Sequence, residues 1–185
     1  MKKITKDFFI FCIIIIAGIT WFFPFSQLSI YKSFTYNPDP VVVEQYKDDL
    51  NRFKSKYNKN SRNQNDLTNE RIQYIIEMYE EDSFLSDERS KITKHRLDSL
   101  LFEIVETREL LIELAFKESY ERNADDFLRL LLEDTLALEE QIQNLIYSNS
   151  NSRFTLERQY SNLYMGFNRN LDLLASFYDD YAQNR

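Results

Sequence analysis

Apolar residues follow two patterns in this chain: one unbroken run near the N-terminus, and periodic repeats from there onward. The run covers 18 residues, from Phe8 to Phe25, and contains no charged side chain. As a helix it extends about 27 Å, at about 1.5 Å per residue, which approaches the roughly 30 Å core of a bilayer. The pattern predicts a transmembrane anchor at residues 8–25, after a basic tail at residues 1–7 and before a connector at residues 26–38.

Basic residues give this predicted anchor an orientation. Lys2, Lys3 and Lys6 precede the run. Only Lys32 follows it closely. Because basic segments stay on the cytoplasmic side, we expect a single-pass protein of the plasma or inner membrane, with a cytoplasmic N-terminus and an extracytoplasmic C-terminal domain. Trp21 lies near the outer end of the run, where interfacial aromatic residues are enriched.

Two other interpretations of the run are open. A cleaved signal peptide has the same basic start, but its apolar core is shorter and is followed by small residues at a cleavage site. Residues 26–28, Ser-Gln-Leu, provide no pair of small residues in that register. The other alternative is a buried helix of a soluble protein. The length of the run and its basic flank favour an uncleaved anchor over both.

Beyond the connector, apolar residues recur at three- and four-residue steps, the period of an amphipathic helix. The chain has only two glycines and three prolines, and no segment alternates with the period of two that indicates a strand. We therefore expect an all-α fold, an antiparallel, coiled-coil-like bundle of about four to five helices over residues 39–185. The predicted helices cover about residues 40–57, 66–79, 87–122, 124–147 and 153–182, with loops at 58–65 and 148–152, and residues 82–86 form either a turn or a kink.

Net charge restricts the partners of the predicted outer domain. Setting aside Asp7 and the four lysines before residue 33 leaves 19 basic and 29 acidic residues, a formal charge of −10. Such a charge repels nucleic acid and anionic lipid head groups. Cys12, the only cysteine, lies inside the apolar run, so the outer domain has no disulfide and depends on its packing.

Two charged residues fall inside predicted apolar faces. Arg108 lies in the middle of the apolar arc over residues 87–122, and Glu139 lies in the arc of the following helix. An antiparallel turn near Asn123 places these two residues level with each other. Because a charge in a core needs a partner, we predict a buried ion pair that fixes the helix register. Two alternatives remain: Arg108 lines a pocket for an anionic ligand, or it reaches solvent.

Aromatic residues are abundant, with 12 tyrosines and 15 phenylalanines, and several repeat along one face of the last predicted helix. Such a stripe is usually core. Tyrosine is also common in protein interfaces, so the same stripe is a candidate docking surface for a partner helix. The residues of this candidate interaction face are Tyr160, Tyr164, Phe167, Phe177, Tyr178 and Tyr181.

The chain has no recognisable catalytic or cofactor-binding pattern. His95 is the only histidine, so the paired Glu-x-x-His motifs of a di-metal bundle are missing. Glycine-rich phosphate loops and a glycine-flanked nucleophilic serine are missing too. Four glutamates at positions 103, 106, 109 and 113 are predicted as a solvated face. We expect a non-enzymatic protein with no cofactor and no metal; an enzyme with an all-carboxylate metal site is the remaining alternative.

These patterns favour a membrane-anchored interaction, assembly or immunity-type factor of the cell envelope, which binds another envelope protein or itself. The second hypothesis is a ligand-sensing bundle that signals through a membrane partner. In outline, a bundle beneath an anchor resembles the helical input domains of bacterial chemoreceptors and sensor kinases. The resemblance covers no motif, and the expected second span and cytoplasmic output module are not found before Arg185.

Overall fold

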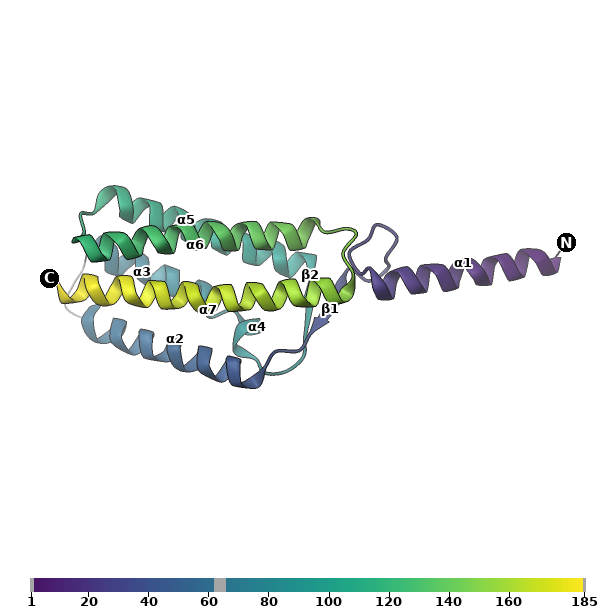
Figure 1. The fold of residues 1–185 in the computed structure, drawn as a ribbon, viewed down its shortest axis with the longest axis horizontal. Coiled ribbons are helices and arrows are strands. Elements are labelled where there is room, and N and C mark those ends of the chain that lie inside the picture. Colours follow the sequence, from purple (N-terminus) through teal and green to yellow (C-terminus); the bar gives the residue numbers. More distant parts are fainter. Residues whose placement is uncertain (1, 62–65, 185) are drawn as a thin grey trace.

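The computed structural model describes residues 2–61 and 66–184, and within them the chain forms a helical bundle from which one helix projects (Figure 1). The all-α class predicted from the sequence is confirmed, apart from two short strands. The elements are α1 (Lys2–Phe22), β1 (Ser33–Tyr36), α2 (Pro40–Ser61), α3 (Leu67–Met78), α4 (Asp82–Leu85), β2 (Ser90–Thr93), α5 (Lys94–Lys117), α6 (Arg122–Tyr147) and α7 (Arg153–Gln183).

Most helix boundaries agree with the sequence because capping residues mark them. Asp66 accepts a hydrogen bond from the backbone amide of Asn69 and caps α3. Ser152 caps α7 in the same way, through the amide of Thr155. Helix α2 continues to Ser61, so the first part of the predicted loop at 58–65 is helical; the rest of that loop, residues 62–65, lies outside the described residues.

Two strands replace structure that the sequence predicted differently. β1 lies in the predicted connector, and β2 lies in the first part of the predicted helix over residues 87–122. They pair antiparallel, with Phe34 opposite Ile92, and both of these side chains are fully buried. Each strand has four residues, too few for a period to show, and the two partners lie far apart in the sequence. Residues 82–86 form the short helix α4 and an extended turn instead of a kink.

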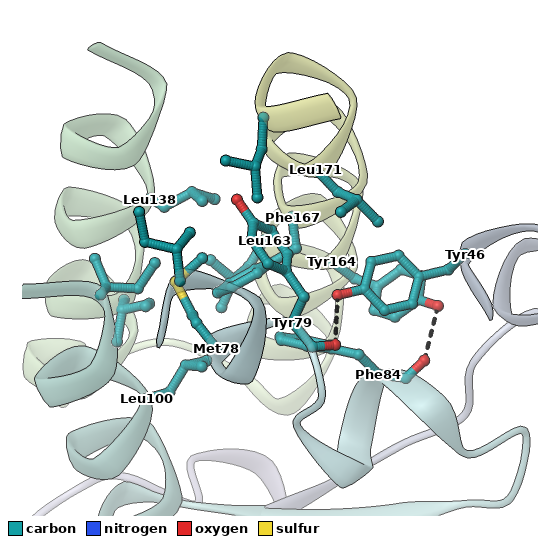
Figure 2. Close-up of a cluster of buried hydrophobic side chains, with 14 of the residues drawn as sticks. Tyr46, Met78, Tyr79, Phe84, Leu100, Leu138, Leu163, Tyr164, Phe167 and Leu171 are labelled. Carbon is teal, nitrogen blue, oxygen red and sulfur yellow. Dashed lines mark hydrogen bonds between the residues drawn. The ribbon is translucent and has the colours of Figure 1, made fainter. Parts of the chain in front are cut away.

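Helix α7 is the centre of the bundle. It packs against α6, α2 and β1, while α5 packs against α6 and α3. Its buried face meets aromatic side chains from the other elements, and Figure 2 shows Phe167 beside Tyr79 and Phe84 in this core. The ring centroids of Phe84 and Phe167 are 4.4 Å apart. Aromatic pairs of this kind add roughly 0.5–1.5 kcal/mol to the free energy of burying their surface.

Helix α1 differs from the others because its apolar side chains face outward. Phe8, Ile14 and Trp21 are 67%, 64% and 63% exposed. The predicted span from 8 to 25 does not continue as one helix, since α1 ends at Phe22 and Phe25 is buried in the bundle. Pro24 accounts for the end, because proline lacks an amide donor and restricts the residue before it.

The transmembrane helix that the sequence predicts over residues 8–25 is not supported by the structure. Among the helices formed by the described residues, none is long and apolar enough to cross a membrane.

Buried tyrosines make the bundle sensitive to alkali. Burial raises the pKa of Tyr160 and of Tyr178 to about 12, and raises the pKa of Tyr46, Tyr79 and Tyr164 above the usual 10.0. Unfolded tyrosines lose their protons at about pH 10, whereas these stay protonated in the fold, so the free energy of unfolding falls as the pH rises above 10. We expect the tyrosinate absorbance of these five buried residues and the loss of helical circular dichroism to develop together. Full tyrosine ionisation in a still-helical protein would contradict this.

Candidate functional site

The most distinctive surface of the molecule is the junction between α1 and the bundle. The backbone carbonyl of Trp21 accepts a hydrogen bond from Arg153 Nε at 3.1 Å, and the Arg153 guanidinium lies 4.9 Å from the centre of the indole ring. The amide of Ile30 donates to Thr20 Oγ1 at 3.2 Å. The end of α1 is therefore attached both to the connector and to the first turn of α7.

Phe25 attaches the connector to the core. Its ring is 1% exposed and packs edge-on against Phe34 of β1, with centroids 5.6 Å apart. Lys94 Nζ lies 5.3 Å from the centre of the Phe25 ring, a cation–π contact at the start of α5. The sequence placed Phe25 in the membrane anchor. In the structure it instead fixes the position of α1 relative to the strands.

A pocket of about 700 Å³ opens at this junction, and its walls combine apolar and basic side chains. Ala17, Ile30 and the exposed ring of Tyr31 form apolar parts of the wall. No carboxylate among the described residues lines it. The hydroxyl of Ser90 is buried in β2 and has no hydrogen-bond partner in the described part of the chain. The basic residues of the wall are Arg89, Lys91 and Arg153.

Together with two neighbouring lysines, these three residues form a group that we call the basic collar. Its members are Lys32, Arg89, Lys91, Lys94 and Arg153. Within the described residues, none of the five forms an ion pair with a carboxylate, whereas bases along the bundle do, such as Arg71 with Glu113 and Arg96 with Glu81. The collar is therefore a local excess of positive charge in a protein of net charge −7.

Electrostatics at Lys94 reflects this excess. Burial lowers the pKa of the Lys94 ammonium, and the nearby charge of Lys32 lowers it further, while Asp98 opposes the shift. Two cations that repel each other at one end of the bundle are stabilised by an anion placed between or above them.

The structure brings Arg108 and Glu139 together, as a contact across the α5–α6 pair. Arg108 Nη1 lies 2.5 Å from Glu139 Oε2, and Nη2 lies 2.8 Å from Glu109. The side chains of Arg108 and Glu139 are 22% and 15% exposed, so the pair lies at the edge of the core and its contribution to stability is reduced by solvent. Because both terminal nitrogens are engaged by carboxylates, nothing here favours an anionic ligand at Arg108.

All six residues of the candidate interaction face on α7 are buried. Their exposed fractions range from 0% to 7%. The hydroxyls of three of them bond inside the bundle: Tyr160 to Ser83, Tyr164 to the carbonyl of Phe84, and Tyr178 to Asn69. The prediction of a docking surface on this face of α7 is therefore wrong, because α2, α3 and α4 cover the face that a partner helix was expected to contact.

Sequence reasoning missed a buried polar network beneath this face. Tyr79 donates to Asn170 Oδ1 at 2.5 Å, and Asn170 Nδ2 donates to Asp134 Oδ2 at 3.0 Å. Arg169 reaches the same Asp134 carboxylate from the surface. The sequence did contain a signal for this network, because Asn170 and Asp134 occupy positions on the apolar faces of α7 and α6. The network fixes how α7 sits against α6 and the end of α3; Asn170 and Asp134 are buried, and only Arg169 is exposed, at the wall of a surface pocket between α6 and α7.

The remaining charged residues give no second site. His95 is exposed at the start of α5, and in the described residues no group of three or more His, Cys, Asp or Glu side chains could hold a metal ion. Of the four glutamates on α5, Glu113 is bonded to Arg71 and Lys117, which lower the pKa of its carboxyl to about 2. Glu106 and Glu109 face solvent.

Comparison with known proteins identifies no relative: no family model matches the chain, and no curated protein or solved structure matches it.

Proposed function

We propose that this protein is a non-enzymatic interaction or assembly factor, of scaffold or immunity type, which α1 attaches to a membrane of the cell envelope. The observation that carries the proposal is the exposure of α1. Phe8, Phe9, Phe11 and Ile14 each expose more than half of their surface, around the whole circumference of a helix that projects from the bundle (Figure 1). A helix that is apolar all round requires an apolar environment.

The residues at the two ends of α1 also suit a lipid bilayer. The uncharged helical part, residues 8–22, extends about 22 Å. Lys6 lies before it, and long basic side chains reach back to the interface from such a position. Trp21 and Tyr31, 63% and 67% exposed, lie at the other end, where amphipathic rings favour the head-group region. The proposed orientation has the N-terminus in the cytoplasm and the bundle outside.

An exposed part of the bundle remains for a protein partner, which is another envelope protein or a second copy. Phe102 and Phe116 on α5 are 61% and 86% exposed. They lie about four helical turns apart and point in nearly the same direction. Val105 and Ile112 lie between them and are half-buried. This face, and not the aromatic face of α7, supports the interaction part of the proposal.

Membrane fractionation tests the anchor. Wild-type full-length protein is expected in the membrane pellet after washing with high salt or alkaline carbonate. Ile13→Asp combined with Ile16→Asp places two carboxylates in the middle of α1, each costing roughly 2.5–3.5 kcal/mol in hydrocarbon. We expect this variant in the supernatant. Val41→Asp is the matched control, because Val41 is 71% exposed on the bundle and should leave the protein in the pellet.

The proposal fails if the wild type leaves the pellet with high salt or if the α1 variant stays there. Crosslinking in intact membranes tests the partner. Crosslinked adducts that disappear in the double variant Phe102→Ser with Phe116→Ser support the interaction role. Recovery of monomer alone contradicts it.

A further inference from the structure

We propose that the basic collar binds the phosphate of an anionic phospholipid head group at the base of α1. This inference rests on the proposed membrane attachment and names the lipid chemistry that the junction selects. It differs from the expectation based on net charge, which by itself predicts repulsion of anionic lipids. The net charge of the chain does not reveal the basic collar, because its five residues come together only in the fold.

Charge is the first argument. Arg89, Lys91 and Arg153 line one pocket, and no carboxylate among the described residues shares its wall. An arginine side chain holds a phosphate through two parallel hydrogen bonds, whereas an ammonium acts as a point charge. The collar offers both kinds of cation. Arg89 Nε donates a hydrogen bond to the neutral side-chain oxygen of Asn37 at 3.2 Å, and Glu157 lines a neighbouring pocket with Arg89 without forming an ion pair with it in the described residues.

The position of the pocket along α1 also favours a lipid. The pocket begins on the last turns of α1, at Ala17 and Thr20, and ends at the two strands. A lipid whose acyl chains lie along the apolar surface of α1 therefore has its head group level with Trp21 and the collar. Ile30, 68% exposed, continues the apolar surface beside the bases. A free phosphate uses the charges but leaves this apolar wall uncovered.

The bases beside the pocket also favour an anion. Lys32 lies between Tyr31 and Ser33, two residues of the pocket wall, and its charge contributes to lowering the pKa of Lys94. A phosphate bound at the junction reduces this repulsion between Lys32 and Lys94.

Trp21 supplies the measurement, because it is the only tryptophan and lines the pocket. Full-length protein in micelles of a neutral detergent is titrated with short-chain phosphatidylglycerol, with short-chain phosphatidylcholine and with inorganic phosphate, and tryptophan fluorescence is recorded. We expect a saturable change with phosphatidylglycerol, little with phosphatidylcholine and none with inorganic phosphate at the same concentrations. Because each base near an anionic surface strengthens binding roughly fivefold, Arg89→Gln with Lys91→Gln should weaken it about 25-fold.

The matched control removes the same two charges elsewhere. Arg122→Gln with Arg129→Gln lies in the first part of α6, at the end of the bundle away from α1, and should leave the affinity unchanged (Figure 1). The proposal is overturned if both lipids bind equally, if the collar variant binds as the wild type does, or if inorganic phosphate alone saturates the change. The collar variant should still pellet with membranes, so loss of lipid selectivity and loss of the anchor are separate results.

Discussion

Phe167→Ala is expected to destabilise the bundle by about 3–5 kcal/mol, the usual range for removing a buried phenylalanine. Phe167 is 0% exposed at the middle of α7 and contacts two rings. Its centroid lies 4.4 Å from that of Phe84 and 6.5 Å from that of Tyr79. Helix α4 supplies Phe84, and Tyr79 is the C-cap residue that follows α3, so the cavity left by the substitution opens where three segments of the chain meet. Denaturant unfolding followed by far-ultraviolet circular dichroism measures the loss.

Phe154→Ala is the control for this result. Phe154 begins the same helix and is 70% exposed, so its removal should change stability by no more than about 0.5 kcal/mol. A loss at Phe167 below about 1 kcal/mol would contradict the central packing of α7. Phe167→Leu, which refills part of the volume, should recover a large part of the loss and thereby distinguish a cavity from a general failure to fold.

Asn170→Leu is expected to cost about 2–4 kcal/mol, although leucine fills a similar volume. The substitution removes the acceptor of the Tyr79 hydroxyl and the donor to Asp134 Oδ2. Tyr79 is 0% exposed and Asp134 is 8% exposed, so neither group regains its bond from solvent. An orphaned buried polar group costs about 1–3 kcal/mol. The same denaturant measurement applies.

A double-mutant cycle identifies the cause of that loss. Tyr79→Phe removes the hydroxyl that Asn170→Leu leaves without a partner, so the double variant should be more stable than the sum of the two single losses predicts. Asn162→Leu on the exposed side of α7 is the control and should cost little. Strict additivity at Tyr79 and Asn170 would show that this hydrogen bond does not contribute to stability.

Much of the helical architecture could be predicted from sequence, for reasons visible at particular residues. Helix α7 covers 31 residues with an unbroken three–four repeat, and Ser152 marks its start as a cap, so its predicted range differs by one residue from the observed one. Helices α2, α3 and α6 likewise begin within two residues of their expected starts. Local signals determine these elements because the hydrogen bonds of a helix close within the same segment.

The strands and the end of α1 could not be predicted in this way. Phe34 and Ile92 stabilise each other only after the chain has folded, since their ladder joins two segments that are distant in sequence. In the sequence Phe25 belongs to an apolar run, whereas in the structure it packs against Phe34 and Lys94. Pro24 was the local sign of that break, but its effect on the run depends on the core that receives Phe25.

By itself the sequence determined that the chain is helical, where most helices begin and end, and that one segment is apolar on every side. Periodicity, caps and composition carry that information locally. Only the tertiary structure decided that the aromatic face of α7 is core and that the predicted pair of Arg108 and Glu139 lies at the edge of the bundle, partly exposed. It also decided that five bases gather where α1 joins the bundle in an otherwise acidic molecule. Those properties depend on which surfaces pack together, and packing joins residues that the sequence keeps far apart.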